Sequence, residues 1–306
     1  MILLAGIRSE SPLALVAAAL RRRGAAFRFV HQRDVADHAI AWRIDERGVT
    51  GILSLGAERI ALEEVTGLYT RMMDDRLLPE LDGLGEDHPA RRHARAFHDS
   101  FFHWSEIAPG RVVNRAEPQG SNGSKPYQAQ LIARHGFLVP PTLITNDPEA
   151  VLAFRRTHGA LVYKSISAVR SIVKRLDADD IARLDAIRWC AVQFQAAIEG
   201  INVRVHVVGE KVFATEIAST HVDYRYAHVD GGETRLSAVT LPRAVRARCI
   251  ALSRELDLPF SGIDLMRTPR GDYYCFEVNP QPGFSYYQGH TGQPIATAVA
   301  RYLAGG

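Results

Sequence analysis

Apolar runs separated by turn signals divide the chain into short predicted strands and helices. The first run, MILLAGI, suits a buried strand. Ser11 and Pro12 then provide an N-cap and a first-turn proline for a helix that ends near Gly24. A second helix, from about Pro89 to Ile107, follows the remaining strand candidates, which are 27–30, 40–44, 50–55, 58–62 and 67–72. This order predicts that the chain begins with a small α/β domain.

The central part of the chain predicts a small separate lobe. The segment NRAEPQGSNGSKP, residues 114–126, is rich in Asn, Ser, Gly and Pro and predicts a linker. PYQAQLIARHG then has apolar residues at helical spacing, TLITND predicts a strand, and a helix follows from Pro148 to about His158. ALVYKSI (160–166) and SIVKRL (171–176) predict a hairpin.

From Trp189 onward the pattern is mainly that of strands. INVRVHVV and KVFATEI flank Gly209 and Glu210, which suit a hairpin turn. WCAVQFQ is a further strand candidate, and Pro242 begins a helix. PFSGIDLMRT and DYYCFEVN surround PRGD and predict a second hairpin. The predicted divisions of the chain are therefore residues 1–113, 114–188 and 189–306.

Composition indicates a globular chain and argues against two classes of partner. The 306 residues are 46% hydrophobic and 23% charged, so the chain can bury a large core. The net charge is only +3, whereas nucleic-acid binding usually shows a concentrated basic patch. The apolar stretch at 13–20 is too short to span a bilayer, which needs about 20 residues. We expect neither a nucleic-acid nor a membrane partner.

Cys190, Cys249 and Cys275 are an odd number of cysteines at wide spacing. Without a CxxC pair they predict small core residues in a reducing compartment rather than metal ligands. MILLAGI lacks the basic leader and the length of a secretory signal. We therefore expect a cytoplasmic protein.

The stretch FEVNPQPGF contains candidate metal ligands. Glu277 and Asn279 share one face of a strand, because side chains alternate between faces. If the hairpin turn centres on the Arg–Gly of PRGD, Asp264 lies opposite Glu277, with Cβ atoms about 4.5–5.5 Å apart. Such carboxylates repel each other unless a cation intervenes, and Asp, Glu and Asn oxygens are typical Mg²⁺ ligands. The alternatives are an exposed face with unbound acids, or a bulge that breaks the register.

Several basic residues are candidates for contact with anions. Arg204 alternates with apolar residues, and its planar fork suits phosphate or carboxylate, whereas His206 on the same face is predicted to be structural. Lys164 ends an apolar strand, where an unpaired ammonium would be costly to bury. Lys125 could meet the same anion. Arg71 ends a strand, where open α/β sheets bind ligands, and a solvated arginine is an equal alternative.

These pieces together resemble the ATP-grasp superfamily, and within it the RimK-like carboxylate–amine ligases, including those that crosslink microviridin-type peptides. The resemblance covers about residues 112–303 and rests on VVN, SKPYQAQLIARHGFLVPPTLITND, LVYKSIS, VQFQAAIEGINVRVHVVGEKVFATEI, HVDYR, GIDLM and FEVNP. It implies an α/β protein with an ATP-grasp fold after a small N-terminal α/β domain. Residues 114–188 would form the small lobe and lid, and residues 189–306 the C-terminal lobe with the metal site.

The resemblance also implies roles for individual residues. The implied ATP-binding residues are Lys125, Lys164, Gln193, Phe194, Gln195 and Glu199. Within this set the two lysines would contact phosphates, the segment 193–195 would bracket adenine, and Glu199 would lie near the ribose. Arg204 would face the transferred group and, with Lys164, be catalytic.

The remaining implied residues bind metal and substrate. Asp264, Glu277 and Asn279 would bind one or two Mg²⁺ ions, with Mn²⁺ as an alternative. Asp223 and Arg225, in HVDYR, would lie near the acceptor site, together with Arg71.

Two stretches depart from the family pattern. The loop after Lys164 is SISAVRS where many relatives have glycines, so Ser165, Ser167 and backbone amides would contact the phosphates. After FEVNPQPG the chain continues FSYYQGHTG, without a glutamate that several relatives carry.

The implied function is a Mg-ATP-dependent ligase that joins a carboxylate to an amine or hydroxyl through an acylphosphate and releases ADP and phosphate. The carboxylate and the acceptor belong to small molecules or peptides. The alternatives are a peptide macrocyclase of the microviridin type, a small-molecule kinase and a non-catalytic ATP-binding module. The sequence leaves both substrates open, and it is compatible with an oligomer.

Overall fold

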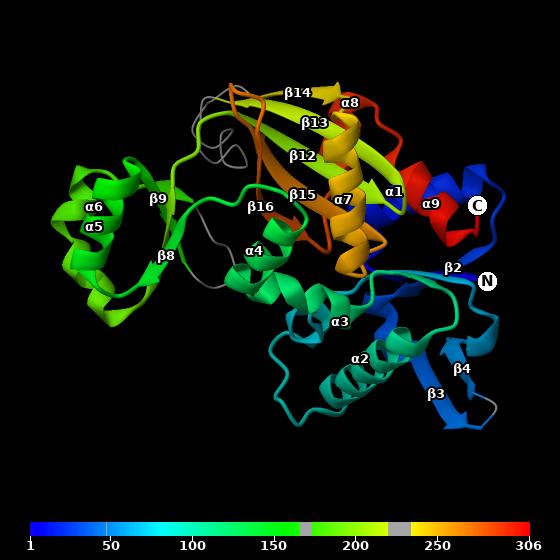
Figure 1. Cartoon of the computed structure of the whole chain (residues 1–306). Coiled ribbons are helices and arrows are strands. Elements are labelled where there is room, and N and C mark those ends of the chain that lie inside the picture. The colour runs from blue at the N-terminus through cyan, green and yellow to red at the C-terminus, as the bar shows by residue number, and fades with distance from the viewer. Residues whose placement is uncertain (47, 166–172, 220–233) are drawn as a thin grey trace.

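The computed structural model describes residues 1–46, 48–165, 173–219 and 234–306 (Figure 1). These ranges form a mixed α/β fold, as predicted, and contain four sheets. Within them, no helix is both long enough and apolar enough to cross a membrane.

A parallel sheet forms the centre of the N-terminal lobe. Its strand order is β2-β1-β6-β7, and its strands are β1 (Ile2–Gly6), β2 (Phe27–His31), β6 (Gly67–Arg71) and β7 (Arg111–Val113). Every residue of β1 is buried because helices cover both faces. Ile2 and Leu4 pack with helices α1 (Ser11–Arg22) and α9 (Ile295–Leu303), whereas Leu3 and Ala5 pack with α2 (Pro89–Ile107).

A smaller antiparallel sheet extends this lobe. Its strands, in the order β3-β4-β5, are His38–Asp45, Gly48–Leu55 and Glu58–Ala61, close to the three short predicted candidates. Helix α2 has the predicted bounds, whereas α1 has Glu10 rather than Ser11 at its N-cap. The 3₁₀ helices of the chain are Gln32–Asp37, Leu62–Glu64, Asp75–Leu77 (η3), Pro79–Leu81, Gly120–Gly123 and Leu184–Trp189.

The predicted linker at 114–126 contains helical turns. Helix α3 (Ala116–Gln119) begins there, and α4 starts at its end and comprises Lys125–Arg134. Glu106 of α2 accepts hydrogen bonds from the backbone N–H groups of Ala116 and Glu117, at 2.5 and 3.2 Å. This side chain satisfies two N-terminal donors of α3 across the fold, so local composition gave no sign of it.

The small lobe lies apart from the other sheets at the left of Figure 1. Its antiparallel sheet has the order β10-β9-β11-β8, with β8 (Thr142–Thr145), β9 (Leu161–Lys164), β10 (Lys174–Arg175) and β11 (Val192–Ala196). Helices α5 (Pro148–His158) and α6 (Ala178–Ala182) accompany it. Strand β11 pairs with β8 and β9, so this sheet extends beyond residue 188, where the sequence placed a boundary.

The C-terminal lobe is built on a five-stranded antiparallel sheet of order β14-β13-β12-β15-β16. The strands are β12 (Ile201–Val208), β13 (Lys211–Ser219), β14 (Thr234–Val239), β15 (Phe260–Arg267) and β16 (Tyr273–Asn279). Helices α4 and α7 (Arg243–Glu255) pack with one face. Helices α8 (Ser285–Thr291) and α9 lie against the other face, and the sequence predicted neither of them, nor β14.

Candidate active site

Asp264 and Glu277 are directly opposed across β15 and β16, which confirms the predicted register. The turn itself differs from the prediction, because Arg267 pairs with Tyr273 and the hairpin loop has five residues. A β-bulge between Asp264 and Leu265 leaves Phe276 without a pairing partner and shifts the register by one residue. This shift places Asp264 opposite Glu277. The predicted pair is therefore correct through two differences that cancel.

Each of these carboxylates has its own cationic partner. Lys125 Nζ donates to Glu277 Oε2 at 2.7 Å and to Asn122 Oδ1 at 2.7 Å. Arg204 Nη1 donates to Asp264 Oδ1 at 2.7 Å. The protein's own cations therefore relieve the repulsion that the sequence argument assigned to a metal ion, and opposed acids alone do not require one.

The cations also keep Glu277 ionised. Burial raises the pKa of this carboxyl, but Lys125, Lys164 and Arg204 together outweigh burial and hold the pKa below its usual value. The cluster thus combines two carboxylates with three cations that originate from three different parts of the chain.

Arg204 is held between the sheet and α8. Its side chain is 7% exposed, and its guanidinium carbon lies 5.8 Å from the centre of the Tyr287 ring. Gly262 leaves room for it, because a Cβ at that position would clash with the guanidinium and with Pro282. His206, two residues further along β12, is fully buried against the rings of Phe260 and Tyr287. Burial lowers the pKa of His206 well below its usual value, so this side chain is a neutral packing element, as predicted.

Asn279 ends β16 beside these acids. Its Oδ1 accepts a hydrogen bond from the backbone N–H of Gln281 at 2.9 Å, which fixes the start of the following loop. In the described ranges, no group of three or more His, Cys, Asp and Glu side chains is arranged to hold a metal ion. The predicted ligand set has two carboxylates and one amide, so water and phosphate oxygens would have to complete it.

The small lobe presents a second group of predicted residues. Lys164 on β9 is the pairing partner of Gln193 on β11, and both side chains are buried. Gln193 Oε1 has no hydrogen-bond partner among the described residues. A buried acceptor of this kind is costly unless a ligand supplies a donor.

The other predicted nucleotide residues differ in their surroundings. Phe194 is 1% exposed and its ring packs in the core of the small lobe. Its backbone is paired with β8 on one side and β9 on the other, so the predicted contact of this residue with adenine stays a prediction. Gln195 Nε2 donates to Thr142 Oγ1 at 3.0 Å. Glu199 is exposed in the connection between β11 and β12.

The predicted substrate residues are only partly described. Arg71 forms an ion pair with Glu10 at 2.6 Å and donates to the Pro282 carbonyl at 3.4 Å. It therefore joins the N-terminal sheet to the loop after β16, and its charge is compensated. Asp223, Arg225 and Ser167 lie outside the described residues.

Sequence reasoning missed several residues that build this site. Asn122 holds Lys125, Tyr287 covers Arg204, and Gly262 leaves space for it. Asn114 exchanges hydrogen bonds with the backbone of Phe260 and thereby ties β7 to β15. The motif VVN, one of the pieces on which the resemblance rests, was the one available signal, and only for Asn114.

Comparisons with known proteins give the following matches. The RimK-like ATP-grasp domain matches residues 124–303. A probable alpha-L-glutamate ligase from Sodalis glossinidius is 30% identical over 192 residues, which cover 58% of this chain and 63% of the relative. The chain thus spans less than two thirds of the length of this relative.

Solved structures share the fold over nearly the whole chain. The macrocyclase MdnC from Microcystis aeruginosa, bound with the precursor peptide MdnA, has a TM-score of 0.81 at 22% identity, over 100% of this chain and 99% of that one. The ATP-grasp ligase PsnB, complexed with a variant of a minimal precursor, Mg and ADP, has a TM-score of 0.80 at 24% identity, over 99% and 97%.

Proposed function

Because the chain belongs to the RimK-like ATP-grasp family, we propose that it is a Mg-ATP-dependent ligase that joins a carboxylate to an amine through an acylphosphate. ADP and phosphate would be released. The observation that carries this proposal is the cluster of Asp264 and Glu277 with Lys125 and Arg204. The names of the similar proteins, a glutamate ligase and two peptide-modifying enzymes, agree with this class of reaction.

The donor set suits Mg-ATP. Two carboxylates and the Asn279 amide are hard oxygen ligands, and an ion that accepts them would share its shell with phosphates. The unpaired Gln193 Oε1 could accept a hydrogen bond from the adenine amino group, while Lys164 lies on the same face. When bound, Mg²⁺ would neutralise charge on the phosphates during transfer. The residues present therefore fit Mg-ATP. They are compatible with one or two Mg²⁺ ions.

The protein's own groups would act mainly by position and charge. Lys125 and Arg204 already pair with the carboxylates, and from these positions their charges would stabilise the phosphates and the developing anion. Tyr287 and Gly262 hold the Arg204 guanidinium in that position. No side-chain nucleophile is needed, because the substrate carboxylate attacks the γ-phosphate itself.

The proposal also covers the domain bounds and the cellular location of the protein. We propose three domains close to the predicted residues 1–113, 114–188 and 189–306, with β11 in the sheet of the small lobe and α4 packed on the C-terminal lobe. We also propose a cytoplasmic location. The three cysteines are free, and burial raises the pKa of the Cys249 thiol to about 12. Cys190 is exposed, so only Cys249 and Cys275 are the predicted core residues. The substrate roles of Arg71, Asp223 and Arg225 stay predictions.

The products of ATP cleavage test this proposal. With Mg²⁺, ATP and a screen of amino acids, diacids and Glu- or Asp-containing peptides, we expect ADP and phosphate, and no AMP or pyrophosphate. Glu277→Gln should abolish this turnover. The variant should still unfold cooperatively when unfolding is measured without ATP, which shows that it is folded. Full turnover in Glu277→Gln, or formation of AMP, would contradict the proposal.

A further inference from the structure

A cavity of about 280 Å³ lies in the N-terminal lobe beside the candidate active site. Thr70 at the end of β6 and Asn114 after β7 line it, and Gln281 lines it from the loop that follows β16. Since β6 and β7 are parallel, the cavity lies at the carboxyl ends of strands, where open α/β sheets bind ligands. The Gln281 N–H donates to Asn279 Oδ1, so this wall is bonded directly to a predicted metal ligand.

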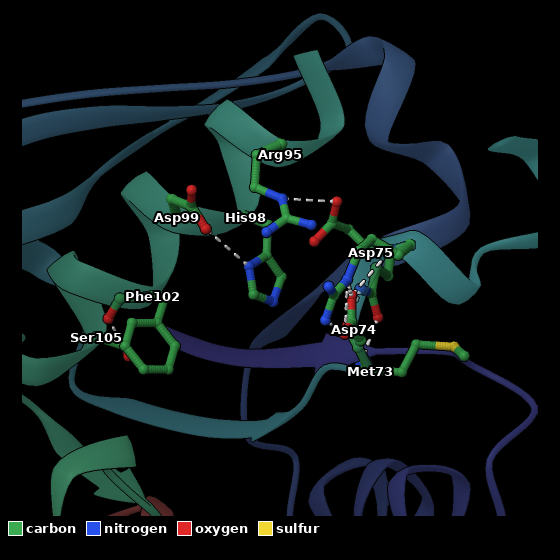
Figure 2. A network of polar contacts seen from close by, with 10 residues as sticks. Met73, Asp74, Asp75, Arg95, His98, Asp99, Phe102 and Ser105 are labelled. Carbon is green, nitrogen blue, oxygen red and sulfur yellow. Dashed lines mark hydrogen bonds and ion pairs between the residues drawn. The ribbon is translucent and has the colours of Figure 1, made fainter. Parts of the chain in front are cut away.

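One face of α2 forms the opposite wall. Arg95, His98 and Phe102 are spaced by three and four residues and therefore project from the same side of the helix. Figure 2 shows Arg95 and His98 directed toward the segment that carries Asp74 and Asp75. The cavity thus combines a guanidinium and an imidazole with an apolar wall that also includes Phe101.

Arg95 is oriented for recognition of an anion. Its Nε donates to Oδ2 of Asp75 at 3.0 Å, and the Asp75 side chain is only 3% exposed. Its two terminal nitrogens donate no hydrogen bond to any described residue, so the end of the guanidinium fork remains available. That end matches a carboxylate bidentately. Asp74 does not oppose such a ligand, because Arg76 pairs with it through Nε and Nη2.

His98 lies one helical turn from Arg95 and adds a second donor when its ring is the tautomer with the hydrogen on Nε2. Its Nδ1 faces Asp99 Oδ1 at 3.4 Å, and its ring stacks with Phe102 at a centroid distance of 6.3 Å. Nε2 makes no hydrogen bond within the described ranges. An anion at Arg95 would therefore have an imidazole and an aromatic ring beside it.

We propose that this cavity binds a free α-amino acid with an apolar side chain, whose amine is the acceptor in the ligation. The α-carboxylate would bind Arg95 and His98, the side chain would lie against Phe101 and Phe102, and the amine would face Gln281. This inference rests on the proposed ligase function and names its acceptor class. The volume is just below the range of about 300–1,000 Å³ that is usual for small-molecule sites, which suits one amino acid rather than a peptide segment.

The bond changes in this step are as follows. The neutral amine nitrogen forms a bond to the acyl carbon of the acylphosphate. The bond between that carbon and the bridging oxygen breaks, and phosphate leaves with the electron pair. One proton passes from the nitrogen to the phosphate, so an amide and hydrogen phosphate result without an oxidant or a further reactant.

Ligand binding tests the inference directly. Leucine, methionine and phenylalanine are titrated calorimetrically into the full chain with Mg²⁺ and ADP. Isopentylamine, 3-(methylthio)propylamine and phenethylamine serve as matched ligands without the α-carboxylate. At least one amino acid should bind at least about tenfold more tightly than its amine, because only the amino acid offers a carboxylate to the guanidinium fork.

Two variants of one helix then assign the contact. Arg95→Gln should weaken amino-acid binding at least about tenfold and leave amine binding unchanged. Arg92→Gln is the control, since Arg92 lies outside the cavity and its Nε donates to the Asp87 carbonyl. The inference is overturned if none of the three amino acids binds, if an amine binds as well as its amino acid, or if Arg95→Gln binds like wild type.

Failure of this inference can be told apart from failure of the ligase proposal. Hydroxylamine carries no carboxylate, so acylphosphate trapping does not use Arg95. Wild-type trapping together with any of the contrary binding results removes the cavity's role and leaves the ligase. Absence of trapping with every candidate carboxylate removes the ligase itself.

Discussion

Replacing Asp264 by Asn should destabilise the free protein, because it removes the partner of a buried cation. Arg204 is 7% exposed and bonds Asp264 at 2.7 Å. With charge centres about 4 Å apart and an effective dielectric constant of about 20, their attraction is about 4 kcal/mol. The repulsion between Asp264 and Glu277, at about 5 Å, would be about 3 kcal/mol on the same scale.

The difference between these two terms sets the expected sign. Loss of Asp264 removes about 1 kcal/mol of net attraction, and the weaker neutral hydrogen bond of Asn removes about 1 kcal/mol more. We expect the free energy of unfolding to fall by about 2 kcal/mol. Repulsion between the acids alone, as judged from the sequence, predicts the opposite sign.

Urea unfolding of the metal-free protein, followed by tryptophan fluorescence and circular dichroism, measures this change. Glu216→Gln is a matched control, because Glu216 pairs with Arg267 on the same sheet but at a more exposed position. It should reduce stability less than Asp264→Asn does. A metal-free Asp264→Asn protein that is as stable as wild type, or more stable, would refute the view that Arg204 compensates Asp264.

Two further predictions separate phosphate recognition from base recognition in the small lobe. Lys164→Ala should weaken ATP binding at least about tenfold more than adenosine binding, because we propose that its ammonium contacts a phosphate. Calorimetry that finds equal losses would make the lysine structural. Gln193→Met should weaken the binding of ATP and of adenosine by similar factors. The ligand-free protein should be no less stable than wild type, because the change removes a buried acceptor that has no hydrogen-bond partner among the described residues. Unchanged adenosine affinity in Gln193→Met would exclude this residue from base recognition.

Much of the fold follows from local pattern. Apolar runs bounded by turn residues predicted β1, β2, β12 and β13, and helices α2 and α5 have the predicted bounds. In each of these, periodicity and capping residues agree with the final packing. The opposition of Asp264 and Glu277 also followed from strand pairing, although the loop and the bulge differ from the expected turn.

The remainder depends on contacts that are distant in sequence. Helix α8, with the sequence SYYQGHT, has weak helical propensity, and Tyr287 within it packs on Arg204 and His206. The pairing of Lys125 with Glu277 spans 152 residues, so no local pattern could reveal it. For the same reason the sequence suggested that a metal ion must separate the two acids, whereas the fold places a cation beside each of them.

The central claim is that a substrate carboxylate is activated as an acylphosphate, and hydroxylamine trapping tests it most directly. The protein is incubated with Mg²⁺, ATP, hydroxylamine and each candidate carboxylate, and hydroxamate and ADP are measured together. We predict that an active carboxylate gives hydroxamate in step with ADP, and that Glu277→Gln gives neither. A stable phosphoester product, with ADP but without hydroxamate from any active substrate, would contradict the account and indicate a kinase on the same fold.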